Sequence, residues 1–206
     1  MFWVKLGGML LFSYLLGGIP FGLLVSWFKN LELRTLGSGN IGATNVYRAL
    51  GLRWAILVFV LDAFKGAGSV LLAQYFLGKG WYAGLCGLFS VFGHIFSPYL
   101  RFRGGKGVAC GFGVMLVLAP WASLLSLLVW ALLVAWRKLV SLASLLASII
   151  LLILLWLFSL PLWVVGVGMG ICLLVFWAHR ANLARLLSGK ELKIQRLNEP
   201  KDKDSE

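Results

Sequence analysis

The amino-acid sequence predicts an all-α, polytopic integral membrane protein with seven transmembrane helices. Of its 206 residues, 61% are hydrophobic and 13% are charged, about half the charged share that the surface of a soluble domain needs. Most of the apolar runs are long enough for at least one helix that crosses a bilayer. Sixteen of the nineteen Lys and Arg residues lie between alternate predicted spans or in the tail. Because cytoplasmic loops collect Lys and Arg, this bias predicts an N-terminus outside and a cytoplasmic C-terminus.

The first half of the chain holds three of the seven predicted spans. Residues 6–28 carry no charge and form the first span, in which Pro20 permits a kink. A polar stretch, residues 29–53, separates it from the second span at residues 54–76. The third span is predicted at residues 81–100.

The second half holds the remaining four spans in two uncharged runs. One helix over residues 108–136 would put the basic residues at its two ends on opposite sides of the membrane, whereas a hairpin at Pro120 keeps them on one side. We expect the hairpin, which gives spans four and five. The run 139–178 is long enough for spans six and seven, with a turn at residues 159–161.

The sequence predicts one transmembrane domain, residues 1–198, followed by a disordered charged tail, residues 199–206. The three cysteines lie in apolar runs without a C-x-x-C pair, so neither a disulfide framework nor a zinc site is predicted. We expect no metal and no cofactor. Membrane orientation already accounts for the net charge of +12, so no nucleic-acid partner is expected.

A polar, glycine-rich stretch at residues 37–48 lies between the first two spans. Glycine lets successive backbone N–H groups converge on an anion, and the helix predicted over residues 43–50 would favour negative charge at its N-terminus. Phosphate binding is one interpretation. The other is a flexible loop whose glycines end one helix and whose Ser38 or Asn40 caps the next.

Two further polar segments are predicted to face the same compartment. Lys106 lies among glycines in residues 104–107, where it would meet a phosphate as a point charge or serve as a positive-inside anchor. In the tail, His179 and Asn182 are three residues apart and share a helix face. His179 is interpreted as a general base, a phosphate ligand or an interfacial residue.

Asp62 and Lys65 are two opposite charges inside the second predicted span. Each alone would be costly in hydrocarbon, but three residues apart they can pair on one helix face. A structural ion pair is one interpretation, and a proton or substrate path is the other. Gly66 and Gly68 are expected to let a neighbouring helix approach this pair closely.

Over nearly its whole length the chain resembles the bacterial acyl-phosphate:glycerol-3-phosphate acyltransferase family. The resemblance rests on four motifs in the expected order: GSGNIGATNVYRALG at 37–51, DAFKG at 62–66, GHIFSPYLRFRGGKGVA at 93–109 and HRANLARLLSGKE at 179–191. Cys110 stands where the family often has threonine, and Leu183 where isoleucine is usual.

This resemblance implies an enzyme of phospholipid synthesis in the bacterial inner membrane, with its active site facing the cytoplasm. It would transfer a fatty acyl group from acyl phosphate to the sn-1 hydroxyl of glycerol 3-phosphate, giving lysophosphatidic acid and inorganic phosphate. The hydroxyl proton would pass either to His179 or to the donor's own phosphate. A monomer is expected, and coupling to the enzyme that forms the acyl phosphate stays open.

The motifs and the resemblance together give three sets of site residues. The expected catalytic set is Ser38, Arg48, Lys106, His179 and Asn182. The expected phosphate-binding set is Gly37, Ser38, Gly39, Asn40, Asn45, Arg48, Gly104, Gly105, Lys106 and Gly107. The expected structural set is Asp62, Lys65 and Glu191, of which Glu191 would tie the tail helix to the body. A transporter of a phosphorylated metabolite and a lipid-binding scaffold are the competing classes, and the few charges within the spans disfavour the transporter.

Overall fold

The computed structural model of the chain describes residues 1–195 and 197, and these form helices and no strand, as predicted. The helices are α1 (Phe2–Gly18), α2 (Phe21–Phe28), α3 (Ala43–Leu50), α4 (Leu52–Leu77), α5 (Trp81–Ile95), α6 (Val108–Leu118), α7 (Pro120–Arg137), α8 (Val140–Leu157), α9 (Leu162–Ala178) and α10 (Arg180–Leu187), with 3₁₀ turns at Leu33–Thr35 and Pro98–Leu100. The segment predicted to be a disordered tail, residues 199–206, lies outside the described residues.

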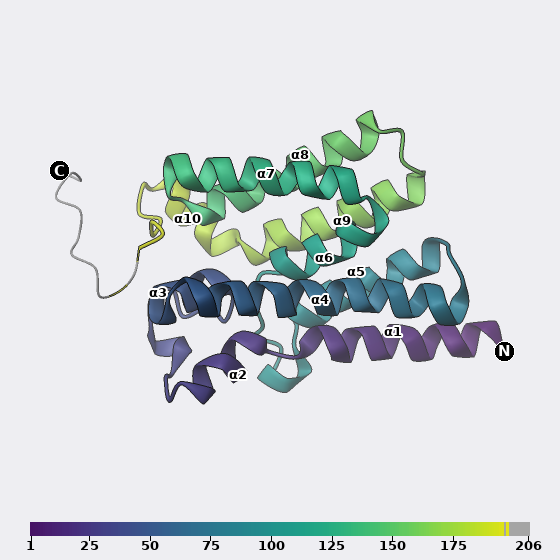
Figure 1. Ribbon diagram of the computed structural model, residues 1–206, viewed down its shortest axis with the longest axis horizontal. Coiled ribbons are helices and arrows are strands. Elements are labelled where there is room, and N and C mark those ends of the chain that lie inside the picture. Colours follow the sequence, from purple (N-terminus) through teal and green to yellow (C-terminus); the bar gives the residue numbers. More distant parts are fainter. Residues whose placement is uncertain (196, 198–206) are drawn as a thin grey trace.

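The long helices run side by side in two layers (Figure 1). Helices α1, α4 and α5 pack together in one layer, and α7, α8 and α9 form the other. Helix α6 contacts α4 and α5 on one side and α7 and α9 on the other, and so joins the layers. The short helices α3 and α10 lie at the end of the bundle opposite the N-terminus (Figure 1).

Five helical segments in the described part of the chain are long and apolar enough to cross a membrane, and a sixth is added if α9 and α10, bent by 62°, are taken as one span. Every predicted span corresponds to a helix or to a broken pair of helices. Helix α6 has only 11 residues, a length of roughly 16 Å, or about half the hydrocarbon core. The count of seven spans and the orientation of the termini therefore stay predictions.

The first apolar run is broken at Pro20, where the sequence permits a kink. Helix α1 ends at Gly18 and α2 begins at Phe21, because proline has no N–H for the helical ladder. The Ile19 carbonyl at the break accepts a hydrogen bond of 2.8 Å from Lys65 Nζ. Lys65 Nζ is also 2.8 Å from Asp62 Oδ1. The buried ion pair in α4 thus holds the break in the first run.

The two hairpins in the second half agree with the prediction. Helix α6 ends at Leu118 and α7 begins at Pro120, the expected breaking residue. Helix α8 ends at Leu157 and α9 begins at Leu162, so the turn includes the predicted residues 159–161. Proline at the first position of a helix lacks only an N–H that would have no partner there.

Glycines let α4 and α6 cross with their backbones in contact. A Cβ on Gly66 would lie 2.1 Å from the Cys110 carbonyl oxygen, and one on Gly113 would lie 1.8 Å from the Ala63 oxygen. The expected close approach at Gly66 is confirmed. The same expectation for Gly68 is wrong, because nothing lies within 4 Å of a Cβ built there. Small residues at such crossings are what permits helices to associate in a membrane.

Replacing Gly66 with alanine is expected to destabilise the bundle, because the new methyl group would overlap a backbone oxygen that cannot move independently. Overpacking of this kind costs about 1–3 kcal/mol. The matched control is Gly68→Ala in the same helix, which has open space and should be neutral or slightly stabilising. The check is the melting temperature of the purified protein in detergent, and equal values for the two variants would contradict the crossing.

Candidate active site

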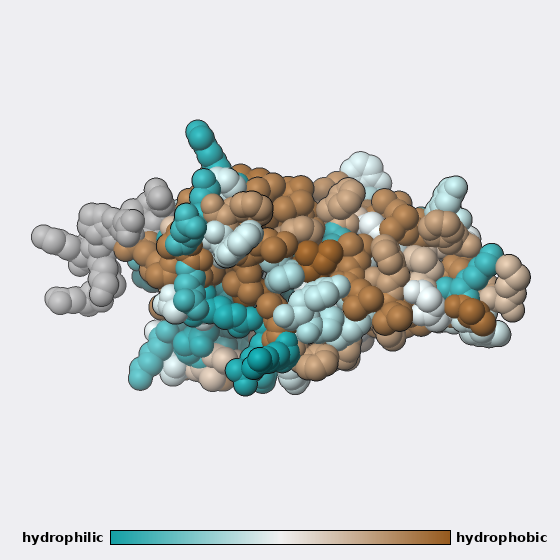
Figure 2. Space-filling model, turned by 90° about the horizontal axis from the view of Figure 1, so that it is seen from below, coloured by the Kyte–Doolittle hydropathy of each residue, from teal (hydrophilic) through white to brown (hydrophobic). Residues whose placement is uncertain are grey.

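Hydrophilic side chains gather toward the end of the molecule that carries α3 and α10, while hydrophobic ones cover most of the bundle (Figure 2). A cavity of about 530 Å³ reaches from this end into the bundle, a volume typical of ligand sites. All three predicted polar segments contribute to its wall, through Arg48, Lys106 and His179. The polar residues that line it are Ser38, Asn40, Thr44, Asn45, Tyr47, Arg48, Asp62, His94, Lys106, Ser141, Ser144, His179, Asn182 and Glu191.

Asn45 in α3 organises the glycine-rich loop before it. Its side-chain nitrogen donates to the carbonyls of Leu33 and Leu36 at 3.1 and 2.9 Å, and its oxygen accepts from the Ser38 N–H at 3.0 Å. A Cβ on Gly37, whose φ is +56°, would lie 2.4 Å from that oxygen. Both hydrogens of the Asn45 amide are therefore used within the loop, its oxygen accepts from the same loop, and Gly37 lets the loop close over it.

The Gly104-Gly105 turn is fixed to the end of α5. The N–H groups of Gly104 and Gly105 donate to the carbonyls of Ile95 and His94, each at 2.9 Å. A Cβ on Gly105 would lie 2.1 Å from His94 Nε2. The two glycines allow the turn to lie directly on His94, and the next residue, Lys106, contributes to the cavity wall. Gly107, in the left-handed conformation at φ +80°, is the N-cap residue that precedes α6.

Lys106 is a half-buried cation without a hydrogen-bond or ion-pair partner among the described residues. The pKa of its ammonium group is lowered to about 8, chiefly by burial; the carboxylate of Glu191 raises it in part, and the nearby Arg185 and Arg48 lower it. At neutral pH the group is thus charged, poorly solvated and close to other cations. Binding of an anion in the cavity would relieve this unfavourable arrangement.

His179 lies at the corner between α9 and α10 and is only 2% exposed. Its Nδ1 is 2.8 Å from the Val175 carbonyl oxygen, which can only accept, so Nδ1 carries the hydrogen and Nε2 keeps its lone pair. Burial and the charge of Lys106 lower the pKa of His179 to about 4. The imidazole is therefore neutral at physiological pH and offers an acceptor at Nε2.

Asn182, one turn further along, is held by the carboxylate of Glu191. Its side-chain nitrogen donates to Glu191 Oε1 at 2.6 Å and to Ser141 Oγ at 2.8 Å. Glu191 also accepts from Ser141 at 2.5 Å and from Arg185 Nε at 2.8 Å. Burial raises the pKa of Glu191, but these hydrogen bonds and Arg185 lower it more, so the net shift is downward. Because both hydrogens of the Asn182 amide are used, its side-chain oxygen remains as an acceptor.

The tail segment, residues 190–195 together with 197, crosses the end of the bundle beside Arg48. One terminal nitrogen of the Arg48 guanidinium donates to the Leu192 carbonyl at 3.1 Å, and the Leu197 N–H donates to the Arg48 carbonyl at 3.1 Å. The Ile194 N–H donates to the carbonyl of Lys138 in the α7–α8 turn at 2.7 Å. Arg48 has five N–H donors, so it keeps donors for a ligand while the tail segment fixes its orientation.

All five predicted catalytic residues line the one cavity. Most of the glycines predicted to bind phosphate do not line it. Of the phosphate-binding set, Gly107 contributes to the cavity wall, whereas Gly37, Gly39, Gly104 and Gly105 shape the loops behind it. The roles of the catalytic set stay predictions. Of the structural set, Glu191 links α10 to α8 through Ser141.

Several lining residues were missed by the sequence analysis. Ser141 and Ser144 lie in an apolar run, but with Ser148 they recur at a spacing of three to four residues, which is the helical period and was the available signal. His94 lies within a quoted motif, yet it was not singled out. It is buried with its Nδ1 3.6 Å from Asp62 Oδ1, a contact between α4 and α5 that a linear pattern does not contain.

The fold and the cavity define an integral membrane protein of the helical type that collects cations and hydrogen-bond acceptors at one site. A family model described as glycerol-3-phosphate acyltransferase matches residues 7–189. The chain belongs to this family of integral membrane acyltransferases of phospholipid synthesis, as the motifs indicated.

Curated relatives and solved structures agree with this assignment. The glycerol-3-phosphate acyltransferases of Aquifex aeolicus and Thermus thermophilus are each 42% identical, over 89% and 90% of this chain and 96% and 93% of theirs. A crystal structure of PlsY, an integral membrane glycerol 3-phosphate acyltransferase in its glycerol 3-phosphate form, matches with a TM-score of 0.88 and 40% identity, covering 93% of this chain and 96% of that one. Its lysophosphatidic acid form matches with a TM-score of 0.86 and 39% identity, covering 92% and 95%.

Proposed function

We propose that this chain transfers a fatty acyl group from acyl phosphate to the sn-1 hydroxyl of glycerol 3-phosphate. The products are lysophosphatidic acid and inorganic phosphate. The observation that carries the proposal is a half-buried Lys106, unpaired within the described part of the chain, that shares one cavity with two acceptors, His179 Nε2 and the Asn182 oxygen. A substrate with a phosphate at one end and hydroxyls at the other matches that division of charge and hydrogen bonding.

The residues of the cavity divide the work by their chemistry. We assign neutralisation of the phosphates to Lys106 and Arg48, because both are cations that line the cavity, Arg48 buried and Lys106 half-buried. Ser38 and Asn40 line the same wall and supply neutral polar contacts to a phosphate. His179 and Asn182 accept hydrogen bonds from the hydroxyls of the acceptor substrate. Holding two anions in attacking geometry against their mutual repulsion is then the main contribution to catalysis.

In the reaction the hydroxyl oxygen attacks the acyl carbonyl carbon, and the bond from that carbon to the phosphate oxygen breaks. Phosphate is a good leaving group, so strong activation of the hydroxyl is unnecessary. An imidazole with a pKa near 4 is a poor proton acceptor at neutral pH. We therefore assign to His179 the orientation of the hydroxyl, and its proton leaves on the released phosphate.

The proposal also covers the membrane in which the enzyme lies, the side that its cavity faces and its oligomeric state. The cavity lies at the end of the bundle where the basic segments gather, and by the positive-inside rule this end faces the cytoplasm of a bacterial inner membrane. Both phosphorylated substrates would reach it from that side. We propose that one chain, a monomer, holds the complete site.

The direct test is phosphate release from palmitoyl phosphate by the purified protein in detergent or liposomes. Release should depend on glycerol 3-phosphate and should yield lysophosphatidic acid in equal amount. Palmitoyl-CoA serves as the control donor and should not support transfer. Transfer from the CoA thioester, or phosphate release without glycerol 3-phosphate, would contradict the proposal.

Replacing His179 with glutamine tests its assignment as an orienting residue. Glutamine keeps an acceptor but cannot take a proton. We expect the KM for glycerol 3-phosphate to rise while kcat falls less than about tenfold, because loss of a true general base costs roughly 10²–10⁴. A kcat lowered by that larger factor at unchanged KM would instead assign the proton to His179.

A further inference from the structure

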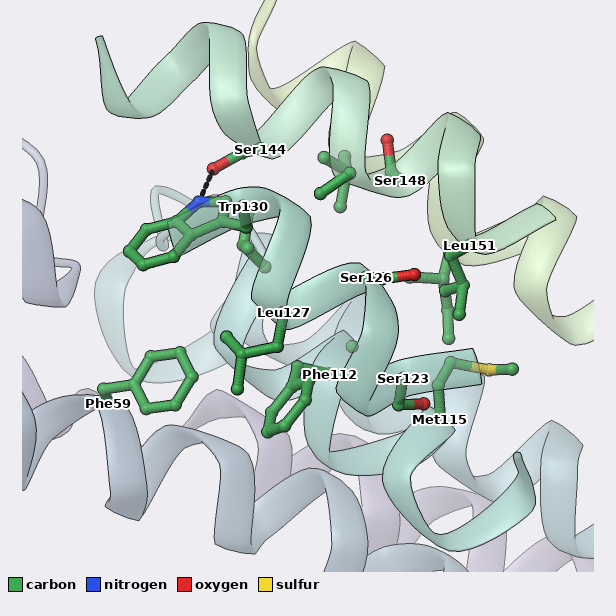
Figure 3. Close-up of a pocket in the computed structure, with 15 residues that line it drawn as sticks. Phe59, Phe112, Met115, Ser123, Ser126, Leu127, Trp130, Ser144, Ser148 and Leu151 are labelled. Atoms are coloured by element: carbon green, nitrogen blue, oxygen red, sulfur yellow. Dashed lines mark hydrogen bonds between the residues drawn. The ribbon is translucent and has the colours of Figure 1, made fainter. Parts of the chain in front are cut away.

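A second, smaller cavity continues from the proposed active site into the bundle. It has a volume of about 80 Å³ and lies between α6, α7, α8 and α9 (Figure 3). The two cavities share five lining residues: Phe59, Val108, Leu127, Trp130 and Ser144. The inner cavity is therefore a continuation of the site and is reached past this shared boundary.

The wall of the inner cavity is effectively apolar, although four serines line it. Ser123 Oγ donates to the Ala119 carbonyl at 2.9 Å and Ser148 Oγ to the Leu145 carbonyl at 2.8 Å. Their hydroxyls are thus used by the helices that carry them. Ser126 Oγ is fully buried and has no hydrogen-bond partner among the described residues, but this single hydroxyl is fewer than the roughly two to four polar partners that hold a buried water. With Phe112, Met115, Leu151, Ile171 and Val175 completing the lining, the cavity suits an alkyl group better than water.

The boundary between the two cavities is held in place by one hydrogen bond. Trp130 Nε1 donates to Ser144 Oγ at 3.1 Å, which joins α7 to α8 (Figure 3). The bonded indole lies beside Leu127 and faces Phe59 across the passage in this view. Because the indole is anchored, the passage has a defined width and direction, as an opening for a narrow, flexible chain requires.

We propose that the inner cavity receives the terminal carbons of the donor's acyl chain and sets the length that the enzyme prefers. This inference rests on the proposed function and deepens it. A cavity of about 150 Å³ lined by apolar side chains holds one benzene, so this one of about 80 Å³ holds roughly three carbons. A chain with more carbons beyond the boundary would meet the packed side chains of Met115 and Leu151, and a shorter one would leave the cavity empty.

Substitutions that fill the inner cavity from either side should shift the enzyme's preference to acyl phosphates with shorter chains. Ser126→Leu adds volume from α7, and Ala147→Leu adds it from α8. We expect the ratio of kcat/KM for palmitoyl phosphate to that for lauroyl phosphate to fall at least about tenfold in each, since one excluded methylene in a hydrophobic pocket is worth about 10–200-fold. The matched control is Ala131→Leu, which adds similar volume on an exposed position of α7.

The ratio is measured within each preparation, so a partly unfolded variant does not change it. Octanoyl phosphate, assayed beside the two longer donors, reports whether each variant is active. Unchanged ratios in Ser126→Leu and Ala147→Leu, with wild-type transfer intact, would overturn the inner cavity as the acyl-end site and leave the proposed function standing. An equal fall in Ala131→Leu would also overturn it. If the wild-type protein transferred no acyl group from any of the three phosphates, the proposed function itself would fail.

Discussion

Lys106→Ala is expected to lower kcat/KM for glycerol 3-phosphate at least a hundredfold. This corresponds to about 2.7 kcal/mol of transition-state stabilisation, the range found when one preorganised electrostatic group is removed. The expected effect is large because Lys106 is half-buried in the cavity wall and unpaired within the described chain, so its charge is poorly solvated and is available to a substrate phosphate. Steady-state kinetics with both substrates varied provide the measurement.

The pH dependence of kcat/KM shows whether the Lys106 side chain acts through its charge or through its shape. Lys106 loses its proton as the pH rises through about 8, so wild-type kcat/KM should fall on the alkaline side from about that pH. Lys106→Arg carries a group that stays protonated, and its profile should lack this alkaline decline even if its maximum is lower. A decline at the same pH in Lys106→Arg would assign the titration to another group.

Glu191→Gln is expected to lower both stability and activity, because Glu191 is 5% exposed and accepts hydrogen bonds from Ser141, Asn182 and Arg185. Breaking a set of bonds to a buried charge costs about 3 kcal/mol. The melting temperature should fall by several degrees, and kcat/KM should fall at least tenfold as Asn182 loses its anchor. The matched control is Glu32→Gln, the same change at an exposed carboxylate.

The same variant makes a second, independent prediction about Lys106. The carboxylate of Glu191 raises the pKa of Lys106, so neutralising it should move the alkaline decline of kcat/KM to lower pH. Glu191 itself has a lowered pKa, so its contribution to wild-type stability is present above pH 4.5 and is lost as the pH falls through its folded pKa. An alkaline decline that stays in place in Glu191→Gln would remove Glu191 from the electrostatics of the site.

Much of the fold was predictable because hydrophobic run lengths and prolines determine it locally. The hairpin at Pro120 followed from a charge argument, and the helix at Ala43–Leu50 from its position after the glycines. The break at Pro20 was anticipated only as a kink, because the sequence does not reveal that Lys65, from another helix, binds the carbonyl left exposed there. Whether a proline only bends a helix or breaks it depends on contacts with neighbouring helices, and a hydropathy pattern carries no information about those contacts.

The sequence predicted many of the residues that line the cavity, but it predicted less well what each of them contacts. Gly104 and Gly105 suggested backbone N–H groups that point at a phosphate, whereas those N–H groups bind the end of α5. Asn45 suggested a ligand contact, which stays a prediction; the residue lines the cavity, and its amide also holds the loop. A glycine or an amide in a motif can serve a ligand or the protein itself, and the packing of the loops shows the contacts with the protein.

The tail segment has a consequence for how the enzyme is made. Its contacts with Arg48 and Lys138 join the last part of the described chain to segments translated much earlier. A ribosome will have delivered every apolar helix to the bilayer before these contacts form. Insertion and catalytic competence are therefore separate events, and a polypeptide that terminates a few codons after α10 would be a stably inserted but inactive product.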